Sequence, residues 1–177
     1  MQVAVRVRNL ERDIYLRVMV RKATKEDFNF FYRLYMHPKV NPYLLYEPME
    51  VKEFVPIYED LLRDEVLWVY EVEGKTVGMF KLVPLKHRTS HIAYLGGLAI
   101  DPDFSGKGEG YNMLKEIIEL AKRLDFLRIE LSVAVHNEKA IRLYEKSGFQ
   151  KEGVLRKYSH MKNLNEFWDE AMMSILL

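Results

Sequence analysis

Three alternating glycines and a lysine lie at the end of an apolar stretch, in the run Ser105-Gly106-Lys107-Gly108-Glu109-Gly110. Because glycine has no Cβ, the main-chain N–H groups of such a run can approach a ligand closely. Leu114 and Ile117, which follow at helical spacing, predict a helix directly behind the run. The start of a helix adds unpaired N–H donors and a partial positive charge. The pattern therefore predicts a phosphate-binding loop with Lys107 as an additional cation, although a plain glycine-rich turn is the alternative.

Spacing excludes two common nucleotide-binding loops. A dinucleotide loop requires Gly-x-Gly-x-x-Gly, whereas the glycines here stand at every second position. A Walker loop ends in Gly-Lys-Ser/Thr, as residues 74–76 do, but Val69 occupies the position of its first glycine. A phosphate ligand of another kind is the remaining interpretation of residues 105–110.

A second set of chemically interesting residues shares one face of a predicted helix over residues 137–147. Asn137, Ile141 and Tyr144 are spaced by four and three residues, and Gly148 follows at a C-cap position. Taken alone, Asn137 is equally well interpreted as a helix N-cap and Tyr144 as a core aromatic residue.

The hydrophobic pattern predicts the elements that must position these residues. Strand-type alternation and β-branched runs surround segments with helical spacing. The order is β-α-α-β-β-β-α-β-α-β-β, which indicates the α/β (α+β) class with a mixed sheet flanked by helices. Residues 92–100 are almost entirely apolar, and we expect a central strand buried on both faces. The predicted strands are 16–21, 66–72, 76–83, 92–100, 127–133, 149–158 and 167–176, and the helices before residue 66 are 24–35 and 50–63.

Composition limits the class of protein further. The 177 residues are 49% hydrophobic with a net charge of +1, which predicts one folded domain over residues 1–177. The absence of cysteine excludes disulfides and thiolate catalysis, and no apolar run is long enough to span a membrane. His87 and His91 are four residues apart outside any predicted helix, so we expect no metal site. A cytoplasmic enzyme or binding domain is the favoured interpretation.

The first 25 residues carry seven Lys or Arg residues against two acids. Residues 1–15 alternate in strand fashion and are a possible extra N-terminal strand. Such a basic hairpin can contact an anionic partner, but exposed strands commonly carry basic residues, so nucleic acid is not the favoured partner.

Residues 105–110 resemble the Gln/Arg-x-x-Gly-x-Gly/Ala loop of the GNAT superfamily of N-acetyltransferases. Some thirty residues later, residues 137–149 (Asn-Glu-Lys-Ala-Ile-Arg-Leu-Tyr-Glu-Lys-Ser-Gly-Phe) are similar to the second hallmark of that family. The predicted element order, with core motifs over residues 92–149, also matches its fold, a mixed and mostly antiparallel sheet with about four helices. Residues 152–157 and 166–173 look like the branch that contains ribosomal-protein N-terminal and polyamine acetyltransferases.

The resemblance implies acetyl transfer from acetyl-CoA to an amine, without a metal. In that family the fourth strand separates from the next one, and pantetheine inserts between them. Leu98, Ala99 and Ile100 would offer backbone groups to it, and the Leu98 N–H would stabilise the developing oxyanion. The loop at 105–110 would hold the pyrophosphate. Asn137 would bond the pantetheine arm, and Tyr144 would protonate the departing thiolate.

The chain departs from the family pattern at two loop positions and at the general base. Ser105 replaces Gln or Arg, and the carboxylate of Glu109 would repel a pyrophosphate unless it points outward or pairs with Lys107. Residues 92–100 contain no carboxylate where many members carry a glutamate base. Possible bases are therefore His91, Tyr94, the loop residue Glu47 and ordered water.

The acceptor pocket is expected near the loop that joins the first two helices, with Tyr43, Tyr46 and Tyr94 as candidate contacts for an amine. The leading hypothesis is an acetyl-CoA-dependent N-acetyltransferase acting directly on a primary amine, either a peptide N-terminus or a small molecule. The alternative is a non-catalytic acetyl-CoA-binding sensor or interaction module on the same fold. Exposed edge strands near the C-terminus make a homodimer possible.

Overall fold

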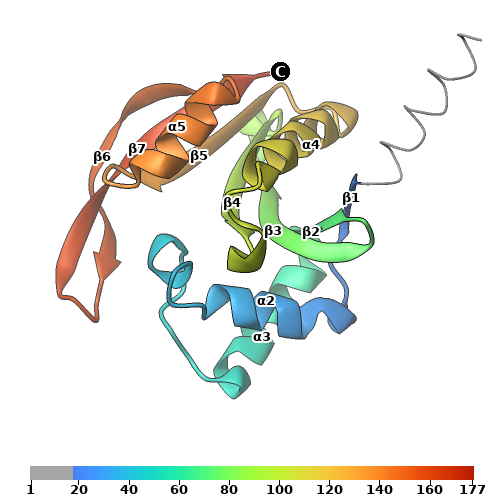
Figure 1. Ribbon diagram of the computed structural model, residues 1–177. Helices are drawn as coiled ribbons and strands as arrows, with labels where there is room; N and C mark the ends of the chain where they lie inside the picture. The colour runs from blue at the N-terminus through green and yellow to red at the C-terminus, as the bar shows by residue number, and fades with distance from the viewer. Residues whose placement is uncertain (1–17) are drawn as a thin grey trace, which may run out of the picture.

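The computed structural model describes residues 18–177 (Figure 1). The possible extra strand at residues 1–15 and most of the basic N-terminal segment lie outside the described residues. From Val18 onward the order of strands and helices is the predicted one, with short 3₁₀ turns between some of them. None of the described helices is long and apolar enough to span a membrane.

The described strands form one seven-stranded sheet in the order β1-β2-β3-β4-β5-β7-β6. Every neighbouring pair is antiparallel except β4 and β5, which are parallel. The prediction of a mixed, mostly antiparallel sheet is therefore confirmed. The strands are β1 (Val18–Lys22), β2 (Leu67–Val72), β3 (Lys75–Pro84), β4 (Ile92–Ile100), β5 (Arg128–Ala134), β6 (Gln150–Met161) and β7 (Glu166–Leu176).

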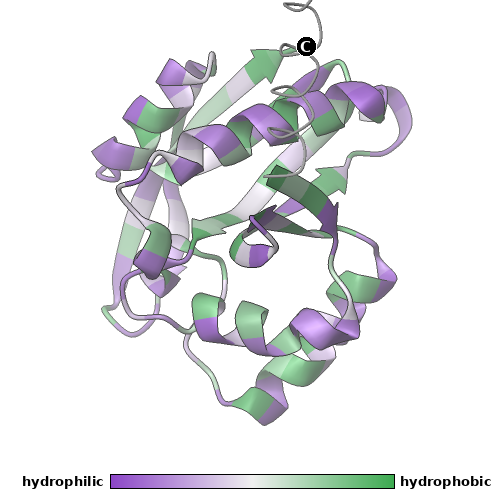
Figure 2. Ribbon diagram, turned by 45° about the vertical axis from the view of Figure 1, so that its right-hand side comes forward, coloured by the Kyte–Doolittle hydropathy of each residue, from purple (hydrophilic) through white to green (hydrophobic). Residues whose placement is uncertain are grey.

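Four α-helices cover the two faces of the sheet in pairs (Figure 1). α4 (Glu109–Arg123) and α5 (Glu138–Lys146) pack on one face, here called the α4/α5 face. α2 (Phe28–Tyr35) and α3 (Val51–Arg63) pack on the other, the α2/α3 face. Each helix carries an apolar stripe toward the sheet and a polar stripe toward solvent, as the alternating colours in Figure 2 show. The sheet therefore separates two apolar cores.

β4 and β5 pair over only a short length. Their register covers Ile92 to Tyr94 on β4 and Arg128 to Glu130 on β5, after which the two strands separate. Beyond Tyr94 the β5-facing edge of β4 has no strand partner in the described chain. Backbone N–H and C=O groups require partners, so this gap can accept an extended ligand.

A β-bulge in β4 lies beside this gap. Lys81 of β3 pairs with Gly96, whereas Met79 pairs with Ala99, so β4 has one extra residue at Gly97–Leu98. Gly97 has φ +57°, a left-handed conformation that glycine adopts easily. Because of the extra residue, Ala99 faces the α2/α3 core although Leu95 faces the α4/α5 core. Bulges of this kind are common next to active sites.

The expectation that β4 is buried on both faces was wrong. Ala93, Leu95 and Ala99 are buried, but the residues between them are only half-buried. The physical reason is the separation from β5, which leaves one side of β4 beside a cavity instead of a packed core.

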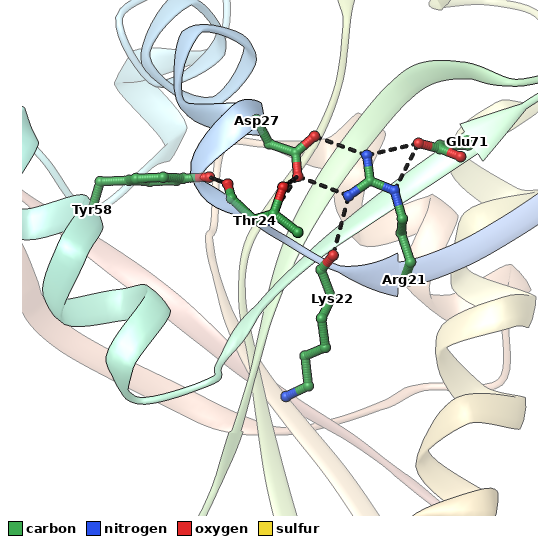
Figure 3. A network of polar contacts seen from close by, with 6 residues as sticks. All are labelled: Arg21, Lys22, Thr24, Asp27, Tyr58 and Glu71. Atoms are coloured by element: carbon green, nitrogen blue, oxygen red, sulfur yellow. Dashed lines mark hydrogen bonds and ion pairs between the residues drawn. The ribbon is translucent and has the colours of Figure 1, made fainter.

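A polar cluster joins β1, β2 and the start of α2 (Figure 3). Arg21 donates to both carboxylate oxygens of Asp27, at 2.7 and 2.8 Å, and to Glu71 at 2.8 Å. Asp27 also accepts from the backbone N–H of Thr24 at 2.8 Å. Burial alone would raise the pKa of Asp27, but the bonds from Arg21 and Thr24 outweigh it and lower that pKa. The cluster therefore connects the end of β1 to the start of α2.

We expect Asp27→Asn to lower the free energy of unfolding by about 1–3 kcal/mol at pH 7, because a charge-assisted bond to a mostly buried group is lost. The carboxylate has a lowered folded pKa, so its contribution is present above the unfolded pKa near 4 and disappears as the pH falls through the folded value. Urea unfolding at pH 7 and at pH 3 measures both effects. Asp60→Asn, in an exposed pair with Arg63, is the control and should lose less than about 1 kcal/mol. Equal losses would contradict the prediction.

Candidate active site

A cavity of about 650 Å³ opens where β4 and β5 separate. Its walls come from β3, β4, β5, α5, the hairpin of β6 and β7, and the loop between α2 and α3. Tyr43, Tyr46 and Tyr94, expected as acceptor contacts, all line it. At one side the ring of Tyr43 lies 6.4 Å from that of Trp168, so the loop and β7 meet over the cavity.

The cavity connects the two faces of the sheet. Tyr144 belongs to the core of the α4/α5 face, yet it lines the cavity together with Tyr46 of the opposite face. A passage between the faces exists because no backbone ladder closes the gap beyond Tyr94. Two molecules can therefore enter from opposite sides and meet in the gap.

Tyr144 lies deep in this cavity. It is 8% exposed, and its ring lies 5.8 Å from that of Phe149. Burial, with a smaller contribution from Tyr94, raises the pKa of Tyr144 far above its usual value. Its hydroxyl therefore remains protonated at neutral pH and is available as a proton donor.

Asn137 is both a helix cap and a cavity residue. Its side-chain oxygen accepts from the N–H of Ala140 at 3.2 Å, so it is the N-cap of α5. The residue also lines the cavity, as does Tyr144, which lies about two turns farther along the same face of the helix. The cap thus fixes the side chain at the rim of the gap.

The β4 backbone expected to contact pantetheine lies at the bulge. Leu98 lines the cavity and is half-buried, and Ala99 and Ile100 follow it beyond the point where β5 has separated. The side of Leu98 that faces β5 has no strand partner, so its backbone is accessible to a ligand in the gap.

The glycine loop between β4 and α4 is open to a ligand. Gly106 and Gly108 have φ of +80° and +85°, and a Cβ at either position would project into empty space. The N–H groups of residues 106–110 donate to no other residue in the described chain. Ser105 is exposed, and Lys107 reaches back to the carbonyl of Asp103 at 3.2 Å. The loop therefore presents unused donors at the start of a 15-residue helix.

The carboxylate of Glu109, at the start of α4, is bound by a tyrosine of the sheet. The hydroxyl of Tyr70, on β2, donates to Glu109 Oε2 at 2.7 Å. Asn112 approaches the same oxygen at 3.4 Å, and Lys107 does not pair with it. The carboxylate therefore neither points outward nor pairs with Lys107; it is directed toward the sheet, where the buried Tyr70 binds it.

The candidate bases are not all brought to the cavity. His91 is exposed at the start of β4 and does not line the cavity. The Tyr94 hydroxyl lies 2.9 Å from Ser132 Oγ, and burial raises the pKa of Tyr94, so this phenol is a poor base at neutral pH and a better positioning group. Glu47 lines the cavity, where its carboxylate accepts from the N–H of Lys162 at 3.3 Å.

The polar cavity residues that were not identified from the sequence include Lys81, Ser132 and Glu170. Each has at least one strand neighbour in the α4/α5 core, so each faces the α2/α3 side. Glu170 is hydrogen-bonded to Ser159 across the β6–β7 pair. Of these three residues, Lys81 was the easiest to recognise as unusual in the sequence. It is a single charge inside the apolar run Met79-Phe80-Lys81-Leu82-Val83.

A model of the acetyltransferase (GNAT) family matches residues 28–149 of the sequence. The chain belongs to this family. It is an N-acetyltransferase of the GNAT type, and the resemblance of its two motifs is confirmed. Among residues 18–177, no cluster of three or more His, Asp or Glu side chains could hold a metal ion, and the expectation of metal-free chemistry stays a prediction.

Curated relatives and solved structures agree with this membership. A spermidine N(1)-acetyltransferase of Escherichia coli is 30% identical over 142 residues, which cover 78% of this GNAT chain and 75% of the relative. An L-amino acid N-acetyltransferase of Escherichia coli is 29% identical over 149 residues, covering 80% and 88%.

The crystal structure of spermidine N-acetyltransferase from Vibrio cholerae, in complex with CoA and spermine, superimposes with a TM-score of 0.80 and 25% identity, covering 90% and 95% of the two chains. That of a ribosomal-protein-alanine N-acetyltransferase from Brucella melitensis has the same fold, with a TM-score of 0.75, 22% identity, and coverage of 90% and 99%. The predicted branch is thereby confirmed.

Gly97 tests the importance of the bulge. A Cβ at this position would lie 2.6 Å from the Tyr35 hydroxyl, and the positive φ adds backbone strain. We expect Gly97→Ala to lower the free energy of unfolding by about 2 kcal/mol or more, measured by urea unfolding. Gly74 has a similar φ of +73° but open space around it. In the control Gly74→Ala, the free energy of unfolding should therefore fall only by the contribution of backbone strain. An equal loss in both variants would show that the close approach to Tyr35 is unimportant.

Proposed function

We propose that this enzyme transfers the acetyl group of acetyl-CoA directly to a primary amine, with residues 1–177 acting as one catalytic domain. The observation that carries the proposal is the gap between β4 and β5, which has a buried, protonated tyrosine on one side and polar groups on the other. The acceptor is a small-molecule amine or a peptide N-terminus.

The residues on the α4/α5 side fit acetyl-CoA. The open glycine loop would bind the pyrophosphate through its free N–H groups, with Lys107 close enough to turn toward it. The unpaired β4 backbone at Leu98, Ala99 and Ile100 would bond the pantetheine arm as a strand would, and Asn137 would bond it from α5. The thioester would then lie beside the Leu98 N–H and Tyr144.

The chemistry follows from this placement. The acceptor nitrogen attacks the thioester carbonyl carbon, and the Leu98 N–H stabilises the negative charge that develops on the oxygen. The new C–N bond forms as the C–S bond breaks, and Tyr144 gives its proton to the departing sulfur. Solvent then restores the Tyr144 proton.

The amine must lose a proton for this attack. Glu47 and Glu170 are the carboxylates that line the cavity in the described chain, so they are the groups that can take this proton, directly or through water. His91 does not line the cavity and has no such role in our proposal. Tyr94 would orient the acceptor through its bond with Ser132.

The relatives indicate two acceptor classes for this chain. Their names give spermidine and L-amino acids as substrates. Both are primary amines that would fit the proposed reaction, but they differ in charge, since spermidine is a polycation and an amino acid carries a carboxylate.

Tyr144→Phe tests the proposed acid. We expect kcat to fall by about a hundredfold, because a positioned acid contributes that much to bond cleavage. The dissociation constant of acetyl-CoA should change little, since the proton is needed chiefly in the transition state. Release of free CoA thiol gives kcat, and calorimetric titration gives the affinity. Tyr111→Phe, on α4 outside the cavity, is the matched control. Unchanged turnover in Tyr144→Phe would remove this residue from the mechanism.

Tyr70→Phe tests the restraint on Glu109. Without the Tyr70 hydroxyl the carboxylate is free to approach the loop and repel the pyrophosphate, so we expect acetyl-CoA to bind several-fold more weakly. Adding Glu109→Gln to Tyr70→Phe should restore the affinity, because the repelling charge is gone. Calorimetric titration at low salt measures all three proteins. A loss of affinity that Glu109→Gln does not relieve would assign the effect of Tyr70 to packing instead.

A further inference from the structure

Lys81 is a buried cation in the wall of the acceptor side of the cavity. It is 9% exposed and belongs to β3, where it pairs with Gly96 of β4. A Cβ on Gly96 or Gly97 would lie 3.6 or 3.3 Å from its Cε atom, so the side chain passes directly over these two glycines. The absence of side chains on both residues gives the lysine its path into the cavity.

The ammonium group has no anionic partner in the described chain. The Lys81 ammonium makes no hydrogen bond or ion pair within residues 18–177, and its Nζ lies 5.3 Å from the ring centre of Tyr46. Beneath Gly97 the fully buried Tyr35 hydroxyl also lacks a hydrogen-bond partner. Tyr35 does not line the cavity, so the Lys81 ammonium is the donor of this pair that an acceptor in the cavity could reach. Buried lysines are normally paired, so an anion is the missing component.

The carboxylates of the cavity lie on the other side. Glu170 is on β7, three strands away from β3, which corresponds to about 14 Å at the usual strand spacing. Its carboxylate bonds Ser159, and that of Glu47 bonds the N–H of Lys162 in the β6–β7 turn. The cavity is therefore dipolar, with a cation at β3 and carboxylates at β6 and β7.

We propose that Lys81 binds an acidic group of the acceptor, so that the enzyme acetylates amines that carry a carboxylate, such as free amino acids, in preference to polyamines. This inference rests on the proposed function and names its substrate class. The carboxylate of the acceptor would lie at β3, and its amine would point across β4 toward the gap, where the thioester is expected.

The charge at Lys81 also acts against a polyamine. A second cation brought into the same low-dielectric wall is repelled, and the repulsion is stronger than it would be in water. Burial lowers the pKa of Lys81, as expected for an ammonium without a counter-ion, and a bound carboxylate would supply that counter-ion. The site thus attracts amines that carry a carboxylate and repels polyamines.

The test compares acceptors that differ only at the acidic group. Free CoA release is measured with acetyl-CoA and a panel of L-amino acids, each beside its own carboxamide and the amine left after decarboxylation, together with spermidine. The carboxamide also represents a peptide N-terminus. We expect kcat/KM for the best amino acid to exceed that for its two counterparts by about tenfold to a hundredfold, since a charge-assisted bond is lost.

Two variants assign this preference to Lys81. Lys81→Met keeps the apolar stem and should abolish the preference for the carboxylate, and Lys81→Glu should reverse it in favour of spermidine and the decarboxylated amines. Lys75→Met removes an exposed lysine from the same strand and should leave the preference unchanged. Thermal unfolding and acetyl-CoA titration verify that each variant is folded, and Lys81→Met alone suffices if Lys81→Glu does not fold.

The outcomes separate the two proposals. Efficient transfer to spermidine or to the carboxamides, equal to or better than transfer to the amino acids, would overturn the role of Lys81 and leave the acetyltransferase proposal intact. An amino acid preference that survives in Lys81→Met would overturn it as well. Acetyl-CoA binding with no transfer to any acceptor in the panel would overturn the proposed function, and this inference with it.

Discussion

The separation of β4 from β5 after Tyr94 is the constraint on which the rest of this structure depends. In a continuous sheet the edge of each interior strand is satisfied by its neighbour, and no ligand can pass between them. Here the ladder ends after three residue pairs, and the β4 backbone that follows is free on one side. The bulge at Gly97–Leu98 lies in this region and changes the face that the following residues of β4 present. The two strands nevertheless stay in one sheet, because β3 holds β4 and β7 holds β5 along their full lengths.

The gap also explains why the two sides of the sheet differ in chemistry. On the α4/α5 side lie the glycine loop and the start of α4, whose free N–H groups suit an anion. On the α2/α3 side lie Lys81, Ser132 and Glu170, placed by strands that each turn one polar residue toward the cavity. In the proposed reaction the sheet would keep the negatively charged acetyl-CoA apart from the acceptor until both reach the gap. Tyr144 would lie where they meet, and its burial keeps its proton in place.

Several features of the site depend on residues far apart in the sequence. Tyr70 and Glu109 are 39 positions apart, and their hydrogen bond joins the first turn of α4 to β2 and directs the Glu109 carboxylate toward the sheet. Lys81 approaches Tyr46 only because the α2–α3 loop folds over the end of β3. Such contacts have no local signature, because each residue has an ordinary alternative role on a solvent-exposed surface.

The sequence by itself determined the order of strands and helices, the glycine loop and the face shared by Asn137 and Tyr144. These features are local, since they follow from the periods of strand and helix and from the conformational freedom of glycine. Only the tertiary structure decided which polar residues reach the cavity. A single extra residue at the β4 bulge moves Ala99 to the opposite face, and His91 lies outside the cavity although it precedes the strand that lines it. Strand pairing and bulges are set by packing between distant segments, and so the surroundings of Lys81 and the partners of Glu109 and Glu170 could be found only in the folded chain.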